Sequence, residues 1–386
     1  MDSEQSFDQI LAFIRKAFQQ PENFIPLHAP YFGGNEKKYV LDTIESTFVS
    51  TVGAYVNRFE DMMQEITGTK YAIATTNGTI ALHLALLVAG VKPGHAVITQ
   101  PLTFAATANA IAHAGATPVF VDVDRNTMGL SPVALKEWLK ENVTVKNEES
   151  FIKSTGQRIA ACVPMHTFGF PLQIEEVVAV CDSYHIKVIE DAAESLGSYV
   201  GNKHTGNFGL LATFSFNGNK TVTSGGGGAV ITNDAAVGKL AKHLSTTAKV
   251  AHAYEFSHDM LGYNYRMPNL NAALACAQLE QLPNFLKNKK ELAGKYAHFF
   301  EGRSETFVTE RPGTTANYWL NTILFKSHEE QQSFLQYSNA QKVMTRPIWR
   351  LMNKLPMYKN CLAGPLSNAE WLEQRVVNIP SSFRPS

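Results

Sequence analysis

The sequence predicts an α/β protein with a large, mostly parallel, doubly wound sheet domain and a smaller α/β domain at its C-terminal end. Short apolar runs alternate with helical patterns between residues 71 and 216, which is typical of parallel strands joined by crossover helices. The pattern changes near residue 245, where a polar and aromatic stretch precedes a long helical segment. The 386 residues are therefore divided into an N-terminal helix in 1–24, a large domain in 25–250 and a small domain in 251–386.

An amphipathic helix is expected near the N-terminus. Within residues 6–19, apolar side chains recur at helical spacing, namely Phe7, Ile10, Leu11, Ile14 and Phe18. We expect this helix to pack on the body of the protein or on a partner subunit. Its polar face is not strongly basic, which argues against a role at a membrane surface.

The large domain is expected to alternate between strands and helices. Strands are predicted at 71–75, 96–99, 118–121, 159–164, 186–189 and 211–216, and helices at 36–48, 55–66, 80–88, 103–114, 132–141 and 174–184. The polar stretch 147–157 is expected to be an exposed insertion. A further strand at 229–232 follows 211–216 after a short return, so we expect these two strands to be antiparallel.

The small domain is expected to begin with a long helix. This helix covers residues 270–300 and should be kinked or broken at Pro283. Strands at 319–325 and 343–349 flank a helix at 329–340.

Composition narrows the class of protein. There are 34 basic and 34 acidic residues, and this balance gives no support to a nucleic-acid partner or an anionic membrane. The four cysteines form no C-x-x-C pair, so we expect reduced thiols, a cytoplasmic location and no metal cluster. The sequence has no apolar run long enough for a membrane span and no signal-peptide pattern.

Three features fall where the strands of a parallel sheet end, which is where ligands bind in such folds. The turn at 76–79, with Gly78 and Thr79, leads into a helix whose first amide groups suit a phosphate. Asp191 follows a buried strand, and Lys220 and Ser215 lie at the end of the next one. Taken singly, each feature has a structural alternative. The turn at 76–79 could be only a helix cap, the carboxylate after the strand could cap the next helix, and Lys220 could be a surface lysine beside the glycine run 225–228.

Together the three features require a ligand with a phosphate, a group that pairs with a buried carboxylate, and a partner for an amine. Pyridoxal 5′-phosphate has a phosphate, a pyridine nitrogen and an aldehyde. Lysine is the residue that forms Schiff bases with this cofactor, and an aspartate at the ring nitrogen keeps it protonated. The first strand is not followed by G-x-G-x-x-G, which disfavours a nicotinamide cofactor.

The sequence also resembles a known family across residues 25–382. The segments NGTIALHLAL, QPLTFAATANAI, VIEDAAESLGS, SFNGNKTVTSGGGG and GYNYRMPNLNAALACAQL are similar to those of the DegT-type nucleotide-sugar aminotransferases. These are fold-type-I pyridoxal-phosphate enzymes, built like aspartate aminotransferase. The most similar branch is the one that acts in bacillosamine and legionaminic acid synthesis. The resemblance implies transfer of an amino group from L-glutamate to C4 of a UDP-linked 4-keto-6-deoxy-N-acetylhexosamine.

The resemblance implies a role for individual residues. Lys220 matches the Schiff-base lysine and Asp191 the partner of the pyridine nitrogen. Glu194 matches the position beside the cofactor's phenolic oxygen, and Phe104 the aromatic side chain that stacks on the ring. The expected phosphate contacts are Gly78, Thr79 and Ser215.

A further match implies a homodimer with shared active sites, because Asn264 corresponds to a residue that reaches the phosphate from the other subunit. Substrate contacts are proposed for Arg266 and Arg346, with ordinary ion pairs as the alternative. Contacts are also proposed for Tyr55 and for His166, for which a structural histidine is the alternative.

Three other functions stay open. The substrate could be a GDP- or dTDP-linked ketosugar aminated at C3 or C4. A sugar dehydratase of this fold usually carries His in place of the lysine, so Lys220 argues against it. A non-catalytic regulator that keeps the fold would more readily have lost Lys220 or Asp191.

Overall fold

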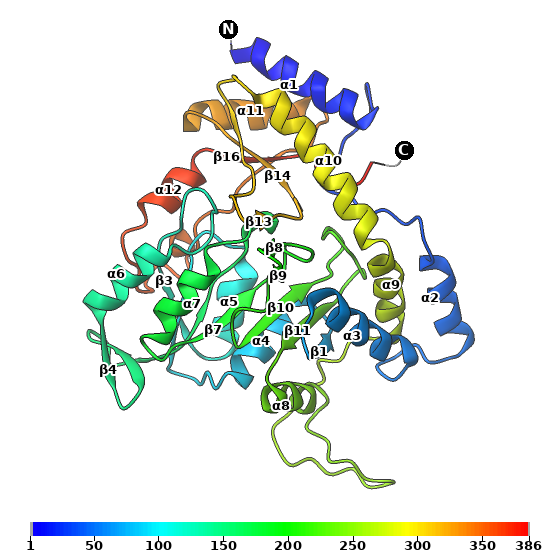
Figure 1. Cartoon of the computed structure of the whole chain (residues 1–386), viewed down its shortest axis with the longest axis vertical. Coiled ribbons are helices and arrows are strands. Elements are labelled where there is room, and N and C mark those ends of the chain that lie inside the picture. Colours follow the sequence, from blue (N-terminus) through cyan, green and yellow to red (C-terminus); the bar gives the residue numbers. More distant parts are fainter. Residues whose placement is uncertain (1–2, 385–386) are drawn as a thin grey trace.

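The computed structural model describes the backbone of residues 3–384 and the side chains of residues 5–384, and its centre is a nine-stranded sheet (Figure 1). The strands are β1 (Tyr71–Thr75), β2 (Ala96–Thr99), β3 (Thr117–Phe120), β4 (Val143–Lys146), β5 (Glu149–Ile152), β6 (Arg158–Val163), β7 (Lys187–Asp191), β10 (Leu211–Ser215) and β11 (Gly228–Thr232). Seven of them lie in the order β1-β11-β10-β7-β6-β2-β3. The strands from β10 to β3 are parallel, and β11 is antiparallel to both of its neighbours, as the short return to 229–232 predicts.

Helices cover both faces of this sheet, which confirms the doubly wound α/β class. Successive residues of a strand point to opposite faces. Ile73, Ile189 and Val230 pack with α4 (Gly78–Val88), α5 (Ala105–His113) and α8 (Ala235–Ser245). On the opposite face, one half of the sheet packs with α3 (Ala54–Thr67) and α9 (Asn269–Glu280). The other half packs with α6 (Pro132–Asn142) and α7 (Ile174–Asp182). Burial on both faces explains why the strands read as continuous apolar runs.

The polar stretch 147–157 differs from its prediction. It contributes β5, which forms a hairpin with β4 and pairs with the start of β6. The hairpin lies at the margin of the sheet, where one side of a strand faces water. Its strands therefore contain polar residues, and these led to the prediction of an exposed insertion.

The C-terminal part of the chain forms a second sheet with helices around it. Its antiparallel strands are β12 (Thr306–Phe307), β14 (Asn321–Leu324), β16 (Val376–Ile379) and β15 (Arg346–Pro347), and its helices are α10 (Leu282–Phe300), α11 (His328–Ala340) and α12 (Ser367–Glu373). The long predicted helix is broken at Gln281, because Pro283 occupies the first turn of α10 rather than the interior of one helix. Strand β16 is not predicted by the sequence.

The N-terminal helix α1 (Ser3–Phe18) lies across this second sheet, beside α10 and α11 (Figure 1). Phe7, Ile10 and Ile14 are buried in one core with residues of α10, α11 and β14. The helix therefore packs on the body of its own chain. Helix α9, by contrast, shares the core of the main sheet and packs on α2 (Glu36–Glu45) and α3. The predicted division at residue 250 stays a prediction.

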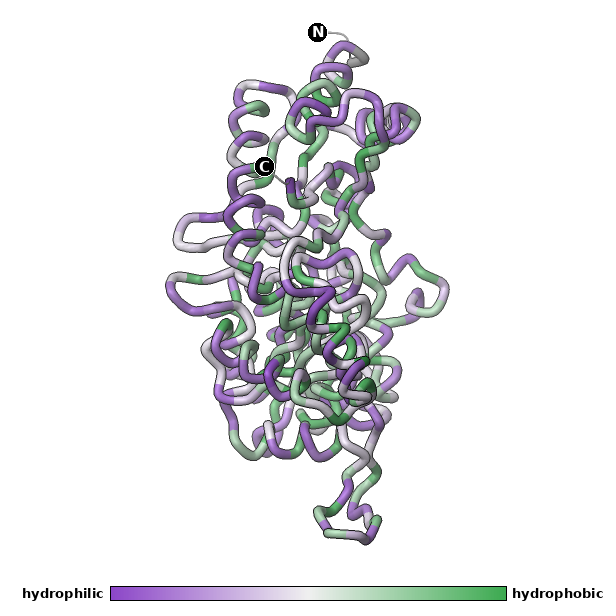
Figure 2. Tube along the Cα trace, turned by 90° about the vertical axis from the view of Figure 1, so that its right-hand side faces the viewer, coloured by the Kyte–Doolittle hydropathy of each residue, from purple (hydrophilic) through white to green (hydrophobic). Residues whose placement is uncertain are grey.

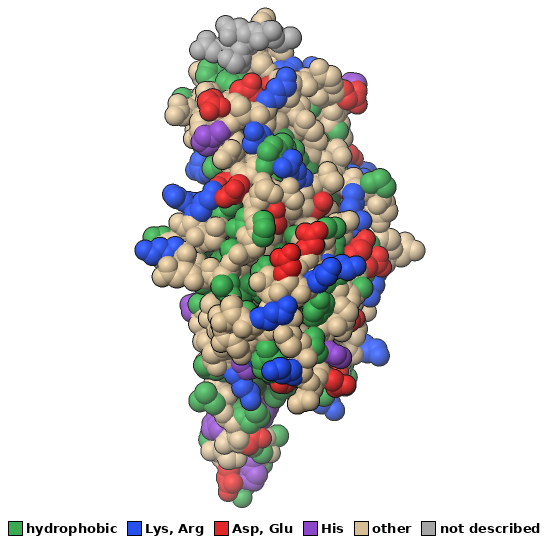
Figure 3. All heavy atoms as spheres, turned by 90° about the vertical axis from the view of Figure 1, so that its left-hand side faces the viewer, with side chains coloured by type: hydrophobic (Ala, Val, Ile, Leu, Met, Phe, Trp, Pro, Cys, Tyr) green, Lys and Arg blue, Asp and Glu red, His purple; other side chains and the backbone are tan. Residues whose placement is uncertain are grey.

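Hydrophobic residues concentrate along the interior of the trace, and polar residues along its outer loops (Figure 2). The segment between α8 and α9 projects from the body below α8 (Figure 1). Acidic and basic side chains are interspersed over the face seen in Figure 3, without a field of one sign. In the part of the chain that is described, none of the helices combines the length and the apolar character that a membrane span needs. The predicted cytoplasmic location stays a prediction.

Candidate active site

A cleft with a volume of about 350 Å³ lies where β7, β10 and the turn after β1 end. It brings together seven of the eight residues predicted to bind the cofactor, all except Asn264. Its lining is Asn77, Gly78, Thr79, Leu82, Phe104, Ala106, Thr107, Met165, Asp191, Ala193, Glu194, Ser215, Asn217, Asn219, Lys220, Trp319 and Trp349. The cleft therefore lies beyond the carboxyl ends of the parallel strands, where ligands bind in such folds.

One end of the cleft is the N-terminus of α4. The side chain of Asn77 caps this helix by accepting a hydrogen bond from the Ile80 amide at 2.9 Å. The amides of Gly78 and Thr79 precede the first intrahelical bond, and the helix dipole adds partial positive charge there. Ser215, at the end of β10, lies against Gly78, where a side chain would come within 2.8 Å of the Ser215 Cβ. These donors form a cradle suited to a phosphate group.

Two adjacent carboxylates at the end of β7 have different surroundings. Glu190 is fully buried and accepts hydrogen bonds from His166 and from the amides of Gly206, Phe208 and Gly209. Burial alone raises the pKa of Glu190, but these hydrogen bonds outweigh it, so the pKa lies below its usual value. The sequence leaves open which of the two carboxylates is structural. The geometry assigns that role to Glu190.

Asp191 instead lines the cleft. The Thr107 hydroxyl donates to it at 2.8 Å and the Ala193 amide at 3.2 Å. Burial raises the pKa of Asp191 despite these bonds and the charge of Lys220. Among the described residues, neither a lysine nor an arginine forms an ion pair with it. A buried carboxylate without a cation is costly, so Asp191 is suited to bind a protonated ring nitrogen.

Lys220 projects into the cleft from the loop between β10 and β11. Its Nζ donates to Glu194 Oε1 at 3.1 Å and lies 3.8 Å from the centre of the Trp319 ring. The other oxygen of Glu194 accepts from the Phe168 amide at 2.8 Å. Burial raises the pKa of Glu194 to about 7, although Lys220 opposes this rise. The amine, its carboxylate partner and Asp191 thus line one cavity.

Aromatic side chains add a wall to the cleft. The Phe104 side chain is 56% exposed, so its ring is available to stack on a planar ligand. The Trp349 ring lies 6.5 Å from Phe104 and 4.8 Å from Phe168, measured between ring centres. The sequence analysis misses Thr107, Met165, Trp319 and Trp349. The two tryptophans lie on distant C-terminal segments, whose approach to the cleft no local pattern records.

Two predicted substrate residues lie outside the cleft. His166 is fully buried, and its Nε2 lies 3.0 Å from a carboxylate oxygen of Glu190. The structure thus places it in a structural hydrogen bond beneath the site. Tyr55, on α3, donates its hydroxyl to Asp42 of α2 at 2.8 Å. It does not face the cleft of its own chain.

The remaining predicted residues also lie outside the cleft of their own chain. Arg346 is exposed on β15 and donates to Asn339 at 3.2 Å. Arg266 donates to Asn264 at 3.2 Å, and Asn264 is itself exposed. None of the three lines the cleft of the chain that carries it. Any contact of Asn264 with the cofactor would have to be made in a second subunit.

The whole chain resembles proteins of known family and structure. The model of the DegT/DnrJ/EryC1/StrS aminotransferase family matches residues 30–384. The chain belongs to this family. It is 36% identical over 359 residues to a GDP-perosamine synthase of Escherichia coli O157:H7, with 93% of each chain covered. It is 34% identical to a GDP-perosamine synthase of Vibrio cholerae, covering 92% of this chain and 94% of that one. The crystal structure of the aminotransferase TlmJ from Streptoalloteichus hindustanus has the same fold, with a TM-score of 0.85 at 22% identity over 94% and 95% of the two chains.

The chain is therefore a pyridoxal-phosphate-dependent nucleotide-sugar aminotransferase, as predicted. The DegT-family cleft fits the cofactor in three places: the cradle at Gly78, Thr79 and Ser215, the unpaired Asp191, and the amine of Lys220. The expected branch is not supported. The two relatives at 36% and 34% identity are GDP-perosamine synthases, and neither carries the name of a bacillosamine or legionaminic acid enzyme.

Proposed function

We propose that this DegT-family enzyme transfers an amino group from L-glutamate to the C4 ketone of a GDP-linked ketosugar, in polysaccharide biosynthesis. The observation that carries this proposal is the cleft that gathers Lys220, Glu194 and Asp191. The choice of GDP rests on similarity to GDP-perosamine synthases along more than nine-tenths of the chain. The choice of glutamate and of C4 rests on the resemblance of the sequence motifs to this family.

Pyridoxal 5′-phosphate supplies an aldehyde that captures amines and a ring that accepts electrons. The residues of the chain hold and direct this chemistry. Asp191 would bind the ring nitrogen, and the start of α4 the phosphate. Lys220 would bind the aldehyde and then carry a proton to and from the reacting carbon, with Glu194 beside it as a carboxyl group that titrates near neutrality. The enzyme thus takes an amino group from the donor in one half-reaction and gives it to the ketosugar in the next, which predicts ping-pong kinetics.

The substrate is tested with a panel of nucleotide ketosugars. Purified enzyme is incubated with the cofactor, glutamate and GDP-, UDP- or dTDP-linked 4-ketosugars, and products are identified by mass spectrometry. We expect the mass change of a ketone converted to an amine with the GDP sugar, and 2-oxoglutarate in equal amount. Amination of a UDP sugar alone would contradict the GDP proposal while leaving the aminotransferase chemistry intact.

The role of the lysine is tested by Lys220→Ala. We expect this variant to lose turnover and the visible absorbance of bound cofactor, because no other lysine lines the cleft among the described residues. Lys290→Ala, at an exposed lysine of α10, is the matched control and should retain both. Normal turnover in Lys220→Ala would overturn the proposed mechanism.

The enzyme is further proposed to be a homodimer in which Asn264 completes the site of the partner. Asn264 is exposed and outside its own cleft, and the adjoining projecting segment exposes Tyr254, Phe256 and Leu261 by 80–83%. Such an apolar surface is typical of an interaction site.

Mixing two inactive variants tests this arrangement. In a mixed dimer of Lys220→Ala and Asn264→Ala subunits, one of the two sites keeps both residues if they come from different chains. We expect mixing to restore activity, and the molecular mass in solution to be that of a dimer. If each site uses the Asn264 of its own chain, mixing restores nothing.

A further inference from the structure

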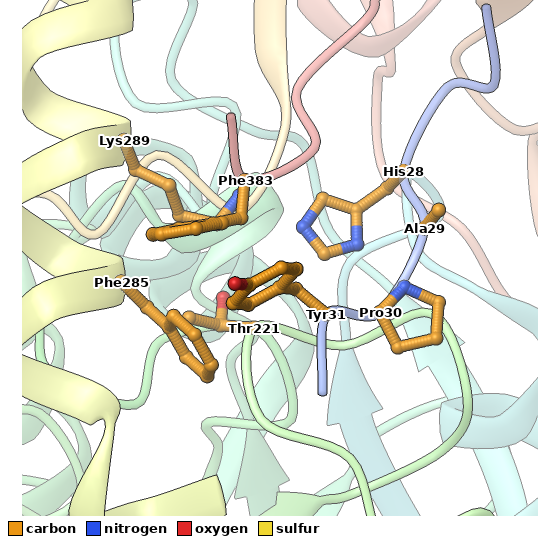
Figure 4. Close-up of a pocket in the computed structure, with 8 residues that line it drawn as sticks. All are labelled: His28, Ala29, Pro30, Tyr31, Thr221, Phe285, Lys289 and Phe383. Carbon is orange, nitrogen blue, oxygen red and sulfur yellow. The ribbon is translucent and has the colours of Figure 1, made fainter. Parts of the chain in front are cut away.

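A second, smaller cavity lies beside Thr221, in the loop between β10 and β11 (Figure 4). It lies between the extended N-terminal segment, α10 and the Lys220 loop, and it leaves about 10 Å³ for the centre of a water molecule, which is about the space that one water needs. Its lining is His28, Ala29, Pro30, Tyr31, Thr221, Phe285, Lys289 and Phe383. Thr221 follows Lys220 directly, so the loop has the active-site cleft on one side and this cavity on the other.

Three buried polar atoms at this cavity lack a hydrogen-bond partner among the described residues. They are both ring nitrogens of His28 and the hydroxyl oxygen of Thr221. His28 comes from the N-terminal segment and Thr221 from the opposite wall, and Figure 4 shows the imidazole pointing into the space between the walls. An unpaired buried polar group costs free energy, and native proteins satisfy such groups with protein atoms or with bound water.

Lys289 cannot supply the missing partner. Its ammonium group donates to three backbone carbonyls, those of Tyr318, Trp319 and Ser381, at 3.3, 3.2 and 2.8 Å. All three of its donors are thus engaged, and a cation offers His28 no acceptor. Burial, then the charges of Lys289 and Lys220, hold the pKa of His28 well below its usual value. A neutral imidazole has one donor and one acceptor nitrogen, which matches a ligand that both donates and accepts.

Residues of this cavity lie on both sides of the Lys220 loop. Lys289 fixes the backbone of Trp319, whose indole N–H donates to the Asn219 carbonyl at 2.6 Å and whose ring faces the Lys220 amine. On the other side, Thr221 directly follows Lys220 and lines the cavity opposite His28. Asn219, Lys220 and Thr221 are consecutive, so the indole bond at Asn219 and any bond to the Thr221 hydroxyl both act on the backbone that carries Lys220.

We propose that this cavity binds ordered water between His28 and Thr221, and that His28 acts through this water as a positioning residue for Lys220. The inference rests on the proposed function, in which Lys220 is the amine that binds the cofactor. Water fits the site because it donates to one polar wall and accepts from the other in a space too small for a substrate. A metal cation does not fit, since the lining of the cavity has neither a carboxylate nor a thiolate to bind it.

The test uses two pairs of variants in the full-length protein. Thr221→Val removes the hydroxyl while keeping the shape, and Thr221→Ser keeps the hydroxyl. His28→Leu removes both ring nitrogens, and His28→Gln keeps a donor and an acceptor. Two properties are measured: the rate at which the Lys220 amine of the apoprotein is acylated, followed by peptide mass spectrometry, and the pH midpoint of the cofactor absorbance change in the loaded enzyme.

We expect Thr221→Val and His28→Leu to change the acylation rate by up to roughly tenfold and to move the pH midpoint by roughly half to one unit, as loss of one hydrogen-bonded position would. Thr221→Ser and His28→Gln should stay close to the wild-type values. A purely structural role would leave the pH midpoint unmoved. A high-resolution crystal structure should show water within hydrogen-bond distance of His28 and Thr221.

Two results would overturn the proposal: a dry cavity in the crystal structure, or unchanged acylation rate and pH midpoint in Thr221→Val. If His28→Leu does not fold, Thr221→Val decides alone. Failure here is distinct from failure of the proposed function. If the proposed function is wrong, Lys220→Ala will still bind the cofactor and turn over. If only the water-mediated role of His28 is wrong, Lys220 will be essential, but its acylation rate and pH midpoint will not respond to changes at His28 and Thr221.

Discussion

At the scale of single residues, the cleft holds an imbalance of charge. Asp191 and Glu194 are both buried, and one lysine, Lys220, pairs with Glu194. Burial raises the pKa of both carboxyl groups, which means that the site without its cofactor resists holding two negative charges. A cationic ring nitrogen at Asp191 would remove this imbalance. The site is therefore electrostatically complete only with a ligand bound.

The first prediction concerns this complementarity. Asp191→Asn keeps the shape of the side chain but removes the anion that, in the proposed function, would hold the ring nitrogen protonated. We expect kcat to fall roughly a hundredfold or more, as when a preorganised electrostatic contact is removed. Thr107→Val, which removes one hydrogen bond to Asp191, should cost about tenfold or less. Steady-state kinetics of both variants measures the difference, and an unchanged kcat in Asp191→Asn would contradict the assigned role.

At the scale of elements, the site is made by strand ends. Strand β7 ends at Asp191, β10 ends at Ser215, and β1 leads into the Asn77 turn that starts α4. Strand β11 returns between β10 and β1, so Gly228 pairs with Thr75 on one side and Ser215 on the other. The spacing of the phosphate cradle therefore depends on the antiparallel strand, although that strand lines none of the cleft.

The second prediction concerns Gly228. A Cβ at this position would lie 2.4 Å from the Asn77 carbonyl oxygen, so Gly228→Ala should push the turn of the phosphate cradle out of place. Overpacking of this kind costs about 1–3 kcal/mol, and we expect cofactor affinity to fall by about tenfold or more. Gly226→Ala is the matched control, since its nearest neighbour, the Thr76 carbonyl oxygen, is 3.7 Å away. Titration of the apoproteins with cofactor checks this, and equal affinities would show that the cradle tolerates the shift.

The elements also show what the sequence can predict. The sequence predicts Asp191, Ser215 and the Asn77 turn because each comes at the end of an apolar run. Such a run indicates a buried strand, and ligand-binding residues lie at the carboxyl ends of such strands. Trp319 and Trp349 are missed because they reach the cleft only through the packing of the second sheet. His28 is missed because it lies in an extended segment, whose sequence has no hydrophobic periodicity to indicate which side chains are buried. The hairpin of β4 and β5 is missed because a strand at the margin of a sheet needs few apolar residues.

At the scale of the whole molecule, the C-terminal part is joined to the site through buried polar contacts. The fully buried Lys289 of α10 binds carbonyls of Tyr318 and Trp319, which precede β14, and of Ser381, which follows β16. Trp319 in turn holds the Asn219 carbonyl of the active-site loop. The second sheet therefore supplies a wall of the cleft, and its packing fixes the lysine loop.

The last prediction follows from the burial of Lys289. Burial lowers the pKa of this amine from 10.5 to about 7, whereas in the unfolded chain it keeps its ordinary value. Between these two values the unfolded state binds more protons than the folded state. The free energy of unfolding should therefore rise with pH across this window, by up to about 1.4 kcal/mol per pH unit, and the charged amine should cost the most stability below pH 7.

Urea unfolding of the apoprotein at pH 6, 7.5 and 9, compared with Lys289→Met, measures this contribution. Methionine has a similar length and no charge, so the variant should lose this part of the pH dependence, while the three carbonyls left without a donor should lower its stability at pH 9. The exposed control Lys290→Met should behave like the wild type, because its side chain is 58% exposed. If Lys289→Met keeps the wild-type slope between pH 7.5 and 9, the amine that joins the second sheet to the active-site loop is not the group that titrates.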